Sequence, residues 1–156
     1  MDLPTLFDLC EPRPDVLAGN IAESDFAADL AQVLRGDAPD DYKDPVRFFA
    51  NTHPTRGLKD LLRNVCLRLT GQSEQVSSIF RLDTNYGGGK THALIALTHA
   101  ARGMQAVANA AEFIDPALLP RKPVRIAAFD GENADPANGR LMGEGIRAYT
   151  PWGELA

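Results

Sequence analysis

Cysteines and long apolar runs are scarce in this 156-residue chain, and both shortages exclude classes of protein. The two cysteines, Cys10 and Cys66, lie in unrelated segments without a C-x-x-C spacing, so neither a disulfide nor a thiolate metal site is expected. Cys66 is instead expected to be a small core residue on a helix. No apolar stretch approaches the roughly 18 residues of a membrane span. The first residues also lack the basic and apolar segments of a signal peptide, which predicts a cytoplasmic protein.

Positive charge is the third shortage. The chain has 16 Lys and Arg against 21 Asp and Glu, a formal net charge of −5, which argues against a nucleic-acid footprint in this segment. The basic residues between Arg56 and Arg68 are interrupted by Asp60 and are spaced around a helix, which indicates a solvated face. The three histidines have no ligand-like spacing, so no metal site is assigned to them. The 44% hydrophobic and 24% charged composition is that of a soluble globular domain.

Helical patterns dominate the first half of the chain. Helices are predicted over residues 20–36, 45–50 and 55–71, with caps at Ser24, Asp44 and Thr55. Each has an apolar stripe at helical spacing, and glycines end the first and the third. Residues 1–71 are therefore expected to form a helical segment that packs on a core made by the rest of the chain.

Residues 72–156 have the pattern of a parallel α/β core. An apolar, partly β-branched segment over 76–82 predicts a buried strand, a helix follows from Lys90, and 124–130 predicts a second strand. A strand, a helix and a strand in this order make a right-handed βαβ unit with parallel strands. The expected fold class is thus α/β, a partial P-loop NTPase domain with an N-terminal helical layer.

The turn between the first strand and the helix carries three successive glycines. Glycine admits positive φ and lets backbone N–H groups approach a ligand closely, and the helix N-terminus adds a partial positive charge. Both favour phosphate, Lys90 can neutralise the β/γ-phosphates of ATP, and Thr91 can bind Mg²⁺. The predicted cofactors are ATP and Mg²⁺, and the predicted binding residues are Thr84, Asn85, Tyr86, Gly87, Gly88, Gly89, Lys90, Thr91 and His92.

The loop departs from the common G-x-x-x-x-G-K-[ST] pattern only at Thr84. At the remaining positions, Gly87, Gly89, Lys90 and Thr91 match the G-x-x-G-x-G-K-T variant of AAA+-type ATPases. The alternative is a glycine turn that merely joins strand to helix. A first-turn lysine opposes the helix dipole and three glycines exceed what a short connection needs, so the nucleotide site is preferred. His92 either orients Tyr86 or a neighbouring loop, or is simply a polar residue of the first turn.

A catalytic carboxylate is harder to assign. Asp130 ends the second strand and is a candidate for the Mg²⁺ sphere, against the alternative that it caps the next turn. Residues 131–149 are polar and glycine-rich, and they are interpreted as a surface connection because their acidic side chains would repel phosphate. Thr150 and Pro151 begin a helix that stops after one turn. This favours a chain cut off within a domain, with an exposed Trp152 and a tendency to associate.

Nearly the whole chain resembles one family of large predicted AAA+-superfamily ATPases, the family of domain of unknown function 499. The matching stretches are PRPDVLAGNIAESDFAADL, YKDPVRFFANTHPTRGLKDLLRNVCLRLTG, TNYGGGKTHALIALTHAARG, AFDGENADP and WGELA. The family's loop reads T-[SN]-[FY]-G-G-G-K-T-H, as residues 84–92 do, so the missing first glycine is a family trait. The resemblance implies ATP-driven work in a larger protein, of which this chain would be the N-terminal fragment. It also implies a role in phage defence, with DNA methyltransferases or defence-system proteins as partners.

Three functions stay open at this point. The leading one is a P-loop ATPase fragment that binds ATP but by itself hydrolyses it negligibly, and its assembly into a homo-oligomer is left open. The second is a nucleotide-binding switch or scaffold without turnover, and the third is an inert truncation. A GTPase is disfavoured because no N-K-x-D segment is present, whereas a small-molecule kinase would suit the loop chemistry equally well.

Overall fold

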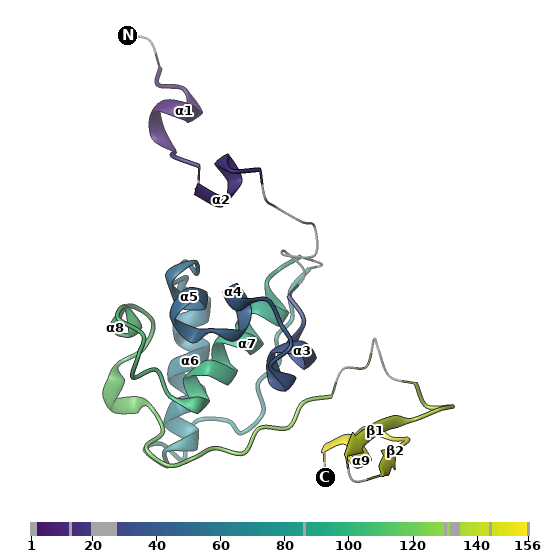
Figure 1. The fold of residues 1–156 in the computed structure, drawn as a ribbon. Coiled ribbons are helices and arrows are strands. Elements are labelled where there is room, and N and C mark those ends of the chain that lie inside the picture. Colours follow the sequence, from purple (N-terminus) through teal and green to yellow (C-terminus); the bar gives the residue numbers. More distant parts are fainter. Residues whose placement is uncertain are drawn as a thin grey trace.

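The computed structural model describes residues 3–12, 14–19, 28–85, 87–129, 131, 135–143 and 145–155. Helices α3 to α8 form the main body (Figure 1). Two short helices, α1 (Leu6–Leu9) and α2 (Pro14–Leu17), stand apart from this body, and a small unit near the C-terminus stands apart on another side. Within these ranges no helix has the length and apolarity that a membrane crossing requires.

Two long helices organise the main body. Helices α6 (Arg56–Leu69) and α7 (Lys90–Arg102) pack against each other. Helices α3 (Leu30–Arg35) and α5 (Pro45–Ala50) cover α7, while α8 (Ala110–Phe113) and the 3₁₀ helix η2 (Pro116–Leu118) cover α6. The short α4 (Asp40–Lys43) joins α3 to α5.

Side-chain caps fix where these helices begin. Asp44 accepts a hydrogen bond from the N–H of Val46 at 2.9 Å, and Thr55 accepts one from the N–H of Leu58 at 3.3 Å, so both predicted caps are confirmed. Helix α3 begins later than predicted. Its cap is Asp29, which accepts from the N–H of Gln32 at 3.1 Å, and the predicted cap Ser24 lies outside the described residues.

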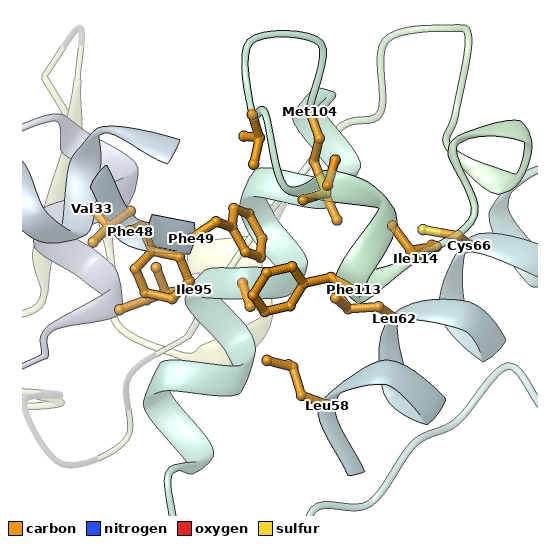
Figure 2. Close-up of a cluster of buried hydrophobic side chains, with 14 of the residues drawn as sticks. Val33, Phe48, Phe49, Leu58, Leu62, Cys66, Ile95, Met104, Phe113 and Ile114 are labelled. Carbon is orange, nitrogen blue, oxygen red and sulfur yellow. The ribbon is translucent and has the colours of Figure 1, made fainter. Parts of the chain in front are cut away.

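The core lies where α5, α6, α7 and α8 meet (Figure 2). Phe49 is fully buried, and its ring meets those of Phe48 and Phe113 at centroid distances of 5.3 and 4.8 Å. Cys66 is also fully buried, as predicted, and burial raises the pKa of its thiol to about 11. The core residues are Val33, Ala38, Phe48, Phe49, Leu58, Leu62, Cys66, Ile95, Ala96, Ala100, Met104, Val107, Ala110, Phe113 and Ile114.

The two segments predicted as parallel strands, 76–82 and 124–129, are extended but form no ladder with any described residue. A strand needs a neighbour to accept and donate its backbone hydrogen bonds. In the first segment these groups are used locally, since the Ser77 hydroxyl donates to the carbonyl of Ile79 at 2.9 Å and accepts from its N–H at 3.1 Å. Ile79 is 81% exposed rather than buried. The parallel βαβ core therefore stays a prediction.

Residues 131–149, predicted as a surface connection, contain the two strands that the structure does describe. β1 (Arg140–Gly143) pairs antiparallel with β2 (Ile146–Ala148), and Leu141 lies opposite Arg147. Glycine content suggested a loop, but Gly145, with φ of 78°, supplies the positive φ that a tight hairpin turn requires. Arg140 reaches Glu154 of helix α9 (Pro151–Leu155) at 3.0 Å. Trp152 in α9 is 81% exposed, as predicted.

Candidate nucleotide site

The glycine loop joins the extended segment after α6 to the start of α7. Gly87 and Gly89 have φ of 76° and 75°, a left-handed conformation that other residues rarely adopt. The N–H of Gly88 donates to the carbonyl of Asn85 at 3.0 Å, which closes a turn. Tyr86 lies outside the described residues. The sequence thus predicted both the position of the turn and the need for glycine within it.

Gly88 is the tightest point of the loop. A Cβ atom at this position would lie 2.4 Å from the Oγ1 and 2.7 Å from the Cβ of Thr84, and 3.0 Å from the carbonyl oxygen of Asn85. Distances below 3.0 Å require the neighbouring atoms to move. Only glycine therefore fits at this position of the compact loop.

Lys90 folds back over the loop. Its Nζ atom donates to the carbonyls of Thr84 and Asn85 at 3.0 and 3.1 Å, and to the Thr84 hydroxyl at 3.3 Å. All three acceptors are exposed and uncharged. Because hydrogen bonds between charged groups are shorter and stronger, phosphate oxygens entering the loop would replace these neutral partners.

The N-terminus of α7 completes the set of anion-binding groups. Gly89 is its N-cap and supplies no side-chain cap, and the first intrahelical bond runs from the N–H of Ala93 to the carbonyl of Gly89 at 2.9 Å. The preceding N–H groups of the first turn therefore have no acceptor within the helix. The half-buried Thr91 makes no hydroxyl hydrogen bond with any residue in the described ranges, so its oxygen is available to a cation bound with phosphate.

His92 ties this helix end to the corner between α5 and α6. Its ring lies 4.5 Å from that of Phe48, with a 30° angle between planes, and its Nε2 is 2.9 Å from the hydroxyl oxygen of Thr52. Since that hydroxyl donates its proton to the carbonyl of Phe48 at 2.6 Å, the His92 Nε2–H is the donor. Among the described residues His92 thus anchors the start of α7 to this corner.

A cavity of about 470 Å³ opens beside the loop. One wall is the loop and the start of α7, and the other is the corner between α5 and α6 together with the first turns of α6. The sequence did not point to this corner, because the contact of Thr52 with His92 spans forty residues. The lining residues are Asn51, Thr52, His53, Thr55, Gly57, Leu58, Leu61, Leu82, Thr84, Gly88, Gly89, Lys90, His92 and Ala93.

The candidate carboxylate Asp130 lies outside the described residues. The segment before it, 124–129, lines a different cavity of about 390 Å³ on the faces of α6 and α7 around Leu69 and Leu97. This cavity and the one beside the loop share no lining residue. No residue of segment 124–129 lines the cavity beside the glycine loop.

Acid is expected to destabilise this helical body through the buried His99 and the half-buried His92. Burial lowers the pKa of both His92 and His99 below the usual 6.5. For His99, the positive charge of Arg102 lowers the pKa further. The 2.8 Å hydrogen bond from the His99 Nε2 to the Tyr42 carbonyl and the negative charge of Asp44 oppose this shift. Below pH about 6.5 the unfolded chain binds more protons than the folded one, so stability present above this pH is lost as the pH falls.

Urea unfolding followed by circular dichroism between about pH 7.5 and 5 tests this expectation. His99→Gln should flatten the pH dependence, because it removes one of the two histidines whose pKa burial lowers. The exposed His53 provides the control, since His53→Gln leaves His92 and His99 in place. A wild-type chain whose stability stays constant over this range would contradict the prediction.

The sequence comparisons add one positive result. Residues 6–131, well over half of the 156-residue chain, match the family described as the DUF499 N-terminal domain. No curated protein and no solved structure shows significant similarity to the chain. The matched range includes α3 to α8 and the complete glycine loop.

Proposed function

Because this chain belongs to the DUF499 family and carries a compact glycine loop at the start of α7, we propose that it binds Mg²⁺-ATP through residues 84–91. The observation that carries the proposal is the geometry of Lys90, whose ammonium lies over the loop within 3.0–3.3 Å of three neutral oxygens. Three features meet at this point: the charged donor of Lys90, the free N–H groups at the start of α7, and a loop with no room for a Cβ atom. This combination suits the terminal phosphates of a nucleotide.

The bound Mg²⁺ would supply charge neutralisation at the β/γ-phosphates, and Thr91 would hold it. Hydrolysis also requires a group that positions the attacking water and usually an arginine. Neither group is assigned to a described residue, so we propose ATP binding for this chain and ATP hydrolysis for the larger protein. The proposed fold of that protein is an AAA+-like α/β P-loop domain, and its proposed location is the cytoplasm. A binding switch without turnover is the alternative. Phage defence and association with defence proteins or further copies of the chain belong to the same proposal.

The test is the substitution Lys90→Ala. Hydrogen bonds to charged groups contribute about 1.5–3 kcal/mol, so the affinity for Mg²⁺-ATP should fall by about 10- to 150-fold. Titration with a fluorescent ATP analogue measures this. The fold should persist, because Lys90 is exposed and bonds only to the loop.

Lys59→Ala is the matched control. Lys59 is also exposed and lies on α6, and it lines neither the loop nor the cavity beside it. The control variant should bind like the wild type. Equal affinities in all three proteins, or no binding by the folded wild type, would refute the proposed function.

A further inference from the structure

We propose that the 470 Å³ cavity beside the loop holds the base and ribose of the nucleotide, an inference that rests on the proposed phosphate site. The cavity is continuous with that site, since Thr84, Gly88 and Lys90 contribute to its wall. A nucleotide with its terminal phosphates on Lys90 would therefore direct its nucleoside toward the corner between α5 and α6. The volume lies within the range of about 300–1,000 Å³ typical of small-molecule sites.

Apolar side chains from three different elements line the cavity. Leu58 and Leu61 come from α6, Leu82 precedes the loop and Ala93 belongs to α7. Leu61 and Leu82 are only half-buried, so they retain apolar surface that a ligand can cover. A flat aromatic ring between aliphatic walls removes such surface from water, at about 25 cal/mol per Å². This chemistry selects a heteroaromatic base rather than a second anion.

Polar side chains also line the cavity. Asn51, His53 and Thr55 line it and are exposed, and their side chains offer donors and acceptors for a base edge or ribose hydroxyls. The corner that carries them is held in place. The Thr52 hydroxyl donates to the carbonyl of Phe48 and accepts from His92, so the corner is linked to the start of α7. Such preorganisation reduces the entropy lost on binding.

The inference predicts that the nucleoside contributes to affinity separately from the phosphates. The experiment compares Mg²⁺-ATP with Mg²⁺ inorganic tripolyphosphate, which has the phosphates but no nucleoside, by isothermal calorimetry on the full chain. The wild type should bind ATP at least about tenfold more tightly. Leu61→Ser should weaken ATP binding several-fold and leave tripolyphosphate binding unchanged, because it alters only the apolar wall.

Leu69→Ser provides the matched control. Leu69 lies eight residues further along α6, is 44% exposed and does not line this cavity, so both ligands should bind as in the wild type. Two results would overturn the nucleoside pocket and leave the proposed phosphate site unaffected. One is equal affinity of the wild type for ATP and tripolyphosphate. The other is a folded Leu61→Ser variant that loses affinity for both ligands equally. Binding of neither ligand by the wild type would overturn the proposed function and this inference with it.

Discussion

Phe49→Ala is expected to lower the free energy of unfolding by about 3–5 kcal/mol, the usual cost of truncating a buried phenylalanine. Phe49 has no exposed surface, and its ring packs edge-on against Phe48 and Phe113. Its removal would leave a cavity between α5, α7 and α8 (Figure 2). Since small domains are stable by only about 5–15 kcal/mol, the substitution would remove a large share of the stability and make the protein sensitive to mild denaturant.

Urea titration with circular dichroism detection measures this change as a shift in the unfolding midpoint. Val46→Ala is the control on the same helix. Val46 is 42% exposed and lies outside the core, so its substitution should change stability by about 0.5 kcal/mol or less. If both variants unfold at the same urea concentration, the cluster around Phe49 is not the core that holds the helices together.

Gly88→Ala is expected to lower the affinity for Mg²⁺-ATP by at least about tenfold, or 1.4 kcal/mol, while the thermal midpoint stays near that of the wild type. The added Cβ would lie 2.4 and 2.7 Å from Thr84 atoms, so the loop must open. The loop is exposed, and its rearrangement disturbs no core residue. The loss of affinity would therefore report the loop conformation and not unfolding.

A second substitution separates this clash from other effects of the methyl group. In the double variant Thr84→Gly with Gly88→Ala, both Thr84 contacts disappear and only the Asn85 carbonyl remains, at 3.0 Å. Lys90 keeps its bonds to the two backbone carbonyls. Fluorescent-nucleotide titrations should show most of the affinity restored. A single Gly88→Ala variant that binds ATP like the wild type would mean that the compact loop is not the binding conformation.

Local signals in the sequence predicted the parts of the fold that depend on local chemistry. Asp44 and Thr55 cap their helices through bonds that span two and three residues. Gly87 and Gly89 have positive φ, as predicted from their place in the turn before Lys90. Such features follow from a few neighbouring residues and need no tertiary structure, so a single sequence is enough to place them.

Other features of the fold depend on partners that lie far away in the sequence. An apolar, β-branched segment such as 76–82 becomes a strand only where a neighbour pairs with it, and the described chain offers none. The contact between Thr52 and His92 joins residues forty positions apart, and nothing in either local sequence specifies it. The cavity beside the glycine loop therefore depends on tertiary packing, which the local sequence does not specify.

The two cysteines differ so much in exposure that thiol labelling can measure the fraction of unfolded molecules. Cys10 is exposed, whereas Cys66 is fully buried and its thiol has a pKa of about 11. With this pKa, only about one in a thousand Cys66 side chains would be thiolate at pH 8. Since the thiolate is the form that reacts with maleimide, folded Cys66 would react very slowly even if the reagent reached it. A folded chain should therefore take up one maleimide label and an unfolded chain two. The mass of the labelled protein would then give the unfolded fraction directly, without an added probe.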